Sequence, residues 1–133
     1  MRLLLDTHLL LWTSVTDDVL ASRFLSSEMK ALIVDDGNEV YFSAVSVWEV
    51  AIKHAAGRPE FRVDPHVFRR TLLDQGYGEL AITSEHGARV ADLPSHHKDP
   101  FDRLLVAQAM VEGITLLTMD ATVSRYPGPV RKV

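Results

Sequence analysis

Short hydrophobic runs alternate with longer segments of mixed polarity along this chain. Residues 3–5, 40–42, 80–82 and 115–118 are apolar or rich in β-forming residues, and each run is bounded by polar residues. Such short runs predict buried strands. Residues 130–133 predict a short last strand.

The longer segments carry the start and stop signals of helices. Asp64 and Asp99 each precede a proline, which is the pattern of an N-cap followed by proline at the first helical position. Gly113 is expected to end the helix that Asp99 begins. Further helices are predicted after Ser43 or Ser46 as far as Gly57, from Ser84 to before Pro94, and between Asp18 and Asp36 with a break near Ser26.

Strands that alternate with helices predict an α/β fold around a mostly parallel sheet, because each crossover helix returns the chain to the same edge. The chain has 133 residues, of which 47% are hydrophobic and 24% charged. This usage excludes a disordered or fibrous chain, and the length favours a single domain over residues 1–133.

Charge and cysteine content narrow the chemistry. The 14 Lys and Arg against 18 Asp and Glu give a net charge of −4, so any nucleic-acid contact must be local rather than a general coating. Cysteine is absent, which excludes disulfide scaffolds, thiol nucleophiles and cysteine-based metal sites. Because Asp6 interrupts the first apolar run and no run is long enough to span a membrane, we expect a cytoplasmic protein.

Two predicted strands end at an aspartate. Asp6 follows the first strand and Asp120 follows the fourth. The carboxyl ends of parallel strands form the rim at which ligands bind in open α/β sheets. Either residue alone could simply cap the next turn, but two such acids on one rim favour a site.

Glu49 and Asp102 are the other candidate acids. Glu49 lies in an otherwise apolar stretch after the second strand, although Lys53 is placed to form an ordinary solvated helix pair with it. Asp99 and Asp102 both fall in the first turn of one predicted helix and could both complement its dipole. We interpret Asp99 as the cap and Asp102 as the acid that takes part in chemistry.

Four carboxylates gathered at one rim would repel each other unless cations joined them. Oxygen ligands select hard ions, so Mg²⁺ or Mn²⁺ is the expected cofactor. Two such ions about 4 Å apart can activate a water and stabilise the leaving oxygen in phosphodiester hydrolysis. The quartet expected to hold metal and to carry catalysis is Asp6, Glu49, Asp102 and Asp120.

Four segments resemble the sequence blocks of PIN-domain nucleases, and most of all those of VapC toxins from type II toxin–antitoxin systems. They lie in the same order over nearly the whole chain, as Leu-Leu-Leu-Asp-Thr-His at 3–8, Ser-Ala-Val-Ser-Val-Trp-Glu-Val-Ala-Ile-Lys at 43–53, Asp-Pro-Phe-Asp-Arg-Leu-Leu-Val-Ala-Gln-Ala at 99–109, and Leu-Thr-Met-Asp at 117–120.

The resemblance implies a PIN-like three-layer α/β/α sandwich and a metal-dependent ribonuclease that serves as the toxin of a type II system. Asp6, Glu49 and Asp102 match the acids that hold the metal, and Asp120 would complete the site or hold a second ion. The resemblance also implies a VapB-type antitoxin that occupies the acidic groove, and a toxin homodimer.

Neighbours of these acids are weaker candidates for contacts to the ligands or to the substrate phosphate. The hydroxyls of Thr7, Ser46 and Thr118 could serve in this way, or they could cap helices and bond strands. Arg103, beside Asp102, could contact RNA or pair with a nearby acid. Of His96 and His97, at most one can face the site as a proton shuttle.

The remaining basic and aromatic residues give a weaker signal. The other Lys and Arg residues are interpreted as scattered surface charge, and this low basic content fits a nuclease that recognises a short stretch of RNA by shape. Trp12 and Trp48 are interpreted as core or dimer-interface residues rather than platforms for stacking bases.

Other functions fit these residues less well. A receiver-type signalling domain needs an acidic pair after the first strand and a late Lys after a strand, whereas Thr7 and His8 follow Asp6 and the late Lys is Lys132. A phosphatase with an Asp nucleophile would need a second Asp at position 8. A PIN-fold enzyme of RNA or DNA processing is the nearer alternative, but such enzymes usually carry extra domains.

Overall fold

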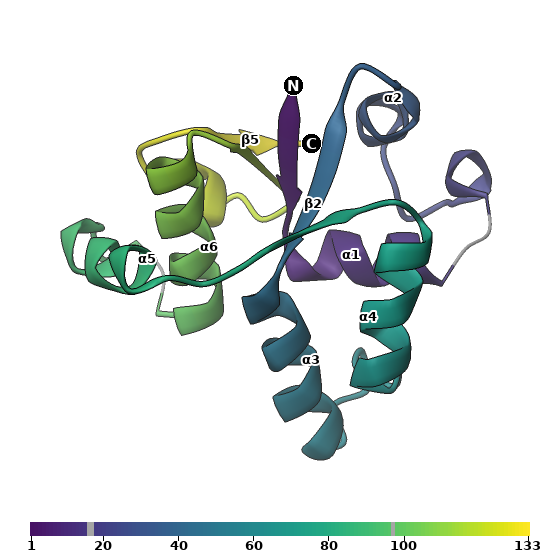
Figure 1. The fold of residues 1–133 in the computed structure, drawn as a ribbon, viewed down its shortest axis with the longest axis horizontal. Helices are drawn as coiled ribbons and strands as arrows, with labels where there is room; N and C mark the ends of the chain where they lie inside the picture. The colour runs from purple at the N-terminus through teal and green to yellow at the C-terminus, as the bar shows by residue number, and fades with distance from the viewer. Residues whose placement is uncertain (16–17, 97) are drawn as a thin grey trace.

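A five-stranded parallel sheet organises the chain in the computed structural model, which describes residues 1–15, 18–96 and 98–133 (Figure 1). The strands lie in the order β3-β2-β1-β4-β5. Their bounds are β1 Arg2–Leu5, β2 Glu39–Ser43, β3 Gly78–Leu80, β4 Thr115–Thr118 and β5 Val130–Lys132.

Six α-helices are described, with short 3₁₀ turns between some of them. They are α1 Thr7–Ser14, α2 Ser27–Val34, α3 Ala44–Ala55, α4 Pro65–Asp74, α5 Ser84–Arg89 and α6 Pro100–Glu112. The 3₁₀ turns are Val19–Ala21, Val90–Asp92 and Val123–Arg125. None of the helices in the described part of the chain is long and apolar enough to cross a membrane.

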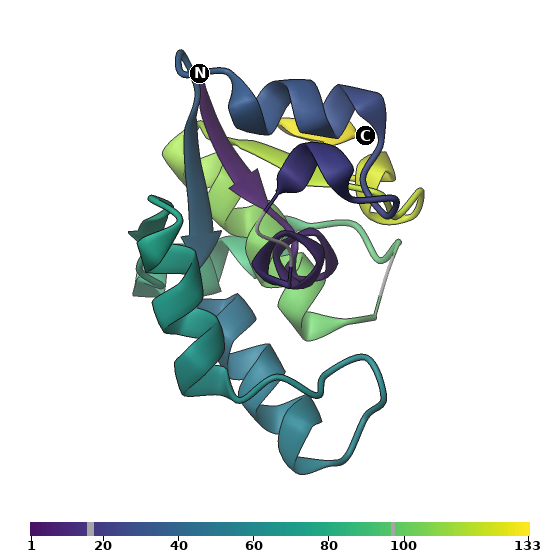
Figure 2. The ribbon, with the colours of Figure 1, turned by 90° about the vertical axis from the view of Figure 1, so that its right-hand side faces the viewer.

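Each face of the sheet is covered by helices, which explains why β1 is apolar at consecutive positions. Leu3 and Leu5 pack with side chains of α1, α2 and α4, whereas Leu4 faces the opposite core, which α6 dominates. All three leucines are fully buried. The views in Figures 1 and 2 show these two helical layers on either side of the strands. The expected three-layer α/β/α sandwich is confirmed.

The strand order places a switch point between β1 and β4. From β1 the chain builds outward to β2 and β3 on one side, and to β4 and β5 on the other. Ligands of open parallel sheets bind beside the carboxyl ends of the strands at such a point. A receiver-type domain has the order 2-1-3-4-5, so the topology excludes that alternative.

Helix starts follow the predicted caps closely. Asp64 and Asp99 accept backbone N–H bonds in front of Pro65 and Pro100, and Gly113 ends α6 in the left-handed conformation. Of the two serines considered for α3, Ser43 is the cap. In the segment 18–36 the break at Ser26 is real, because its hydroxyl caps α2.

The third strand lies two residues earlier than predicted. Residues 80–82 are apolar, but the strand spans Gly78–Leu80, and Ala81 and Ile82 are exposed. Pairing with β2 sets this register, with Tyr41 opposite Gly78. A Cβ at position 78 would lie 2.7 Å from the Tyr41 ring, so this close approach requires glycine. The pairing of β3 with β2, rather than the apolar pattern of residues 80–82, therefore determines where the strand lies.

Candidate active site

A pocket of about 280 Å³ opens where β1, β2 and β4 end. All four acids predicted from the sequence contribute to its wall, and they come from four separate segments of the chain. Its lining consists of Asp6, His8, Glu49, Lys53, Arg58, Glu60, Phe61, Asp99, Asp102 and Asp120.

Asp6 is held on both carboxylate oxygens. It is the N-cap of α1, with Oδ1 accepting from the Leu9 N–H at 3.0 Å, and Oδ2 accepts from the Thr118 hydroxyl at 2.6 Å. Burial raises the pKa of Asp6, and the Thr118 hydrogen bond counteracts part of that shift. Capping and a place in the pocket are thus compatible roles of one side chain.

Glu49 lies almost fully buried on α3, with 2% of its surface exposed. Thr7 Oγ1 is 2.6 Å from Glu49 Oε1 and 2.9 Å from Ser46 Oγ. Because a carboxylate can only accept and a hydroxyl has one proton, Thr7 donates to Glu49 and accepts from Ser46. Oε2 of Glu49 forms an ion pair with Lys53. The predicted helix pair exists, but it is buried rather than solvated.

Of the two acids in the first turn of α6, Asp99 is the cap, as the spacing predicts. Asp99 Oδ1 accepts from the N–H groups of Phe101 and Asp102, at 2.8 and 3.2 Å, so it caps α6. Desolvation raises the pKa of Asp102 to about 8, with further contributions from Asp99, Glu49, Asp6 and Asp120. The negative charges of these neighbouring acids therefore help to raise the pKa of Asp102.

Asp120 is exposed and also organises the turn after β4. Its Oδ1 accepts from the N–H groups of Thr122 and Val123, and its own N–H donates to Thr118 Oγ1 at 3.0 Å. Thr118 thereby bridges Asp6 and Asp120 across the switch point. The hydroxyls of Thr7 and Thr118 touch acids as expected of groups that orient ligands, although their functional roles stay predictions.

The comparison with protein-family models decides the family. The model described as PIN domain matches residues 3–129, nearly the whole chain. This chain belongs to the PIN domain family. The predicted resemblance to PIN-domain nucleases is confirmed.

A solved structure has the same fold as this PIN domain. The crystal structure of VapBC2 from Rickettsia felis bound to a DNA fragment from their promoter contains a chain that superposes with a TM-score of 0.70. The match covers 100% of this chain and 99% of that one at 13% sequence identity, so it supports a common fold. A search of curated proteins returned no match.

Other predicted residues of this PIN domain lie outside the pocket lining. Arg103 donates to the carbonyls of Pro94 and Val90 and to the Tyr126 hydroxyl, at 2.9 to 3.2 Å, which ties α6 to the segment before it. His96 packs against Tyr126 with the two rings tilted and their centroids 5.2 Å apart. His97 lies outside the described residues.

Neither tryptophan is fully buried. Trp48 is 57% exposed and packs edge-on against Phe101, so it is not a core residue. Trp12 is half-buried and stacks on Phe24. A dimer interface remains a prediction for both.

Sequence reasoning missed part of the pocket wall. His8 follows Asp6 by two residues and lines the pocket from the first turn of α1, which the helix spacing could have indicated. Glu60 and Phe61 lie in the loop after α3 that returns to the pocket. The sequence of that loop does not indicate that it returns to the pocket.

The donor set suits a hard divalent cation, because the wall offers carboxylate oxygens from several segments. The side chains are nevertheless not gathered as ligands: within the described ranges, no three His, Asp or Glu residues are close enough together to hold an ion. The buried polar side-chain atoms of the same ranges all have hydrogen-bond partners. Binding an ion would therefore require these side chains to move closer together.

Proposed function

We propose that residues 1–133 form a single PIN-like nuclease domain that hydrolyses RNA phosphodiester bonds with Mg²⁺ or Mn²⁺, as the toxin of a type II toxin–antitoxin system. The observation that carries this proposal is the pocket at the switch point of the sheet, which Asp6, Glu49, Asp102 and Asp120 line together. Membership of the PIN family supports phosphodiester hydrolysis as its chemistry.

Asp6, Glu49 and Asp102 would hold the divalent ion, with Asp120 completing the site. Such an ion supplies a Lewis acid that activates water and stabilises the leaving oxygen. Thr118 fixes the orientation of Asp6, and Thr7 fixes that of Glu49. Asp99 keeps the first turn of α6 in place under Asp102. Arg58 supplies positive charge on the same wall, where a substrate phosphate would enter.

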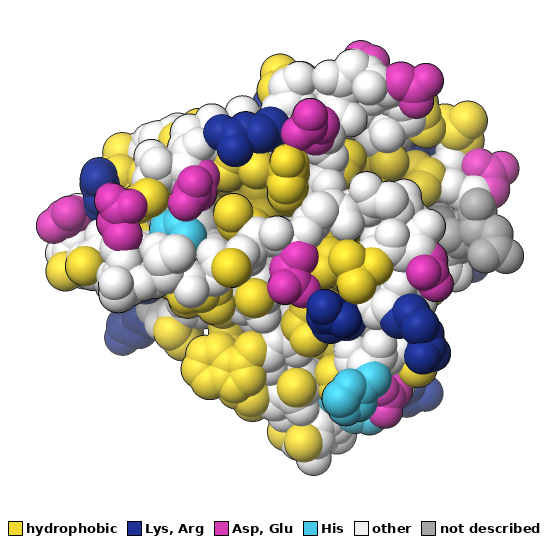
Figure 3. All heavy atoms as spheres, viewed as in Figure 1, with side chains coloured by type: hydrophobic (Ala, Val, Ile, Leu, Met, Phe, Trp, Pro, Cys, Tyr) yellow, Lys and Arg dark blue, Asp and Glu magenta, His cyan; other side chains and the backbone are white. Residues whose placement is uncertain are grey.

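The toxin role and its partners rest on the resemblance of the sequence blocks to those of VapC toxins, and a structural neighbour supports them. VapBC2 of Rickettsia felis shares this fold over nearly the full length of both chains. This neighbour supports the proposal of a VapB-type antitoxin. That the antitoxin covers the acidic pocket, and that this chain forms a homodimer, are proposed from the sequence resemblance. The net charge of −4, and the mixture of basic and acidic side chains on the face shown in Figure 3, support a local RNA contact rather than a general coating.

Cleavage of total cellular RNA by the purified chain, freed of any bound partner, tests this proposal. The reaction is run with Mg²⁺, with Mn²⁺ and with a chelator, beside the Asp102→Asn variant. We expect discrete fragments with metal and the unaltered chain, and no fragments in the other reactions. The fragment ends then identify the RNA that is cut.

Equal cleavage in chelator or by Asp102→Asn would refute the metal-dependent assignment. Cleavage of single-stranded DNA but not of RNA would instead support a processing nuclease of the same fold. Co-expression with a candidate antitoxin should suppress the fragments if the toxin role is correct.

A further inference from the structure

Lys53 is held in the acidic pocket by three contacts from three segments. Its ammonium forms an ion pair with Glu49 Oε2 one helical turn earlier on α3. It also lies 5.0 Å from the ring centroid of Phe61, in the loop after α3, and 5.5 Å from that of Phe101, at the start of α6. Aromatic faces attract cations, so both rings favour the ammonium at this point.

This arrangement differs from a surface ion pair in its burial. The side chains of Lys53 and Glu49 are 18% and 3% exposed. An exposed pair at this spacing contributes little and separates easily, but breaking a buried pair leaves a charge without compensation. Lys53 therefore places a compensating positive charge beside a buried carboxylate.

The same carboxylate belongs to the quartet proposed to bind metal. Glu49 Oε1 already accepts from Thr7, and Oε2 faces Lys53. A divalent ion on Glu49 would lie close to the ammonium, and two cations on one carboxylate repel each other strongly in a partly buried site. The two aromatic rings keep Lys53 beside the pocket, so the ammonium remains a competitor for Glu49.

We propose that Lys53 is a built-in competitor of the divalent cation, occupying Glu49 in the metal-free protein and giving up that carboxylate when the ion binds. This inference rests on the proposed metal-dependent function and adds a residue that sets the affinity for the ion. Lys53 thus lowers that affinity while stabilising the metal-free fold.

Titration of Mn²⁺ into the purified chain by calorimetry at pH 8 tests the proposal. Lys53→Met keeps an unbranched stem for the two rings but removes the charge. We expect Lys53→Met to bind Mn²⁺ about tenfold more tightly, which corresponds to about 1.4 kcal/mol. Its melting temperature without metal should fall, and Mn²⁺ should raise that temperature by more than in the unaltered chain.

Two single variants and one pair serve as controls. Lys53→Arg keeps the charge, so its affinity should stay near that of the unaltered chain. Arg58 lines the same pocket, whereas the ion pair with Glu49 is formed by Lys53. Arg58→Met should therefore change the affinity less than Lys53→Met does. In a Glu49→Gln background, Lys53→Met should no longer tighten binding, because the shared carboxylate is gone. If Lys53→Met does not fold, Lys53→Gln replaces it.

The outcomes separate this inference from the function on which it rests. If the unaltered chain binds Mn²⁺, Asp102→Asn abolishes binding and Lys53→Met leaves the affinity unchanged or weaker, the competitor role is wrong and the metal site stands. An equal gain in Arg58→Met would also overturn it, as a general effect of charge. If the unaltered chain does not bind Mn²⁺, both proposals fail.

Discussion

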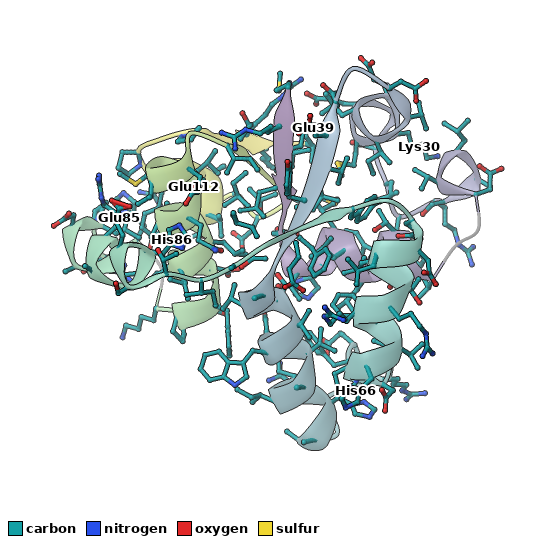
Figure 4. All side chains as sticks on the ribbon, viewed as in Figure 1. Lys30, Glu39, His66, Glu85, His86 and Glu112 are labelled. Atoms are coloured by element: carbon teal, nitrogen blue, oxygen red, sulfur yellow. The ribbon has the colours of Figure 1, made fainter. Side chains whose placement is uncertain are left out.

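Each end of the sheet carries a hollow lined by acidic residues, and the two hollows differ in how deeply those acids are buried. The hollow at the amino ends of β2 and β3 is the larger, about 420 Å³ against about 280 Å³ at the carboxyl ends. Its acids are exposed: the Asp35 carboxylate accepts from the Gly37 N–H, and Glu39, labelled in Figure 4, accepts from the Tyr41 hydroxyl. At the carboxyl ends Asp6 and Glu49 are buried.

The difference shows that burial of like charges, rather than the size of a hollow, marks the candidate site. Exposed acids are stabilised by water and by their own turns at little cost. Buried acids that face one another oppose folding, and such an arrangement is typical of functional sites. If the two hollows differ in function as they do in burial, substitutions at the carboxyl ends should affect RNA cleavage more than those at the amino ends.

The largest effect is expected from removing one acid at the carboxyl-end pocket. Asp102→Asn and Asp6→Asn should each lower RNA cleavage on the order of a thousandfold, the scale typical of losing a preorganised electrostatic contact. Both variants should remain folded, because an amide at either position carries no negative charge that could add to the repulsion within the cluster. Cleavage rates and circular dichroism measure the two effects.

Asp99→Asn is the matched control for Asp102→Asn, since it makes the same change in the same turn of α6. Asn caps a helix about as well as Asp, so most of the activity should remain. An indispensable Asp99 with a dispensable Asp102 would reverse the assignment of the two residues.

A smaller loss is expected when the bridge across the switch point is removed. Thr118→Val deletes the hydroxyl that donates to Asp6 and accepts from the Asp120 N–H, so activity should fall about 10- to 100-fold. The lost hydrogen bonds should also lower the free energy of unfolding by about 1–2 kcal/mol. Thr118→Ser keeps the hydroxyl and should retain both properties; if Thr118→Val is fully active, the bridge is only structural.

The metal-free protein should become less stable as the pH rises from about 4 to about 8. In this interval folded Asp102, with its pKa raised to about 8 by burial and then by Asp99, keeps a proton that the unfolded chain has released. The expected decrease from this group is on the order of 5 kcal/mol. Urea unfolding at several pH values measures it, and an equally steep decrease in Asp102→Asn would contradict the assignment.

The smallest effect is expected at the amino-end hollow. Glu39→Gln should change cleavage less than twofold and stability by at most about 0.5 kcal/mol, because the side chain is exposed and bonded within its own strand. The same two assays measure it. A strong loss of cleavage would mean that the larger hollow takes part in function.

Much of this arrangement could be predicted because local rules decide it. The buried run of β1 and the caps Asp64 and Asp99 depend on neighbouring residues, and Asp6 and Asp120 share a rim because parallel strands end together. The burial of Lys53 could not be predicted from its spacing to Glu49, since distant segments enclose the pair. The same holds for the register of β3.

The bond from Thr118 to Asp6 joins residues 112 positions apart. Contacts of such long sequence separation form late in folding, because a large loop must close before they contribute free energy. On the ribosome β1 stays without β4 until residues 115–118 have been synthesised, and Asp6 and Asp120 cannot meet before then. The order of synthesis therefore delays assembly of the acidic pocket until β4 has left the ribosome.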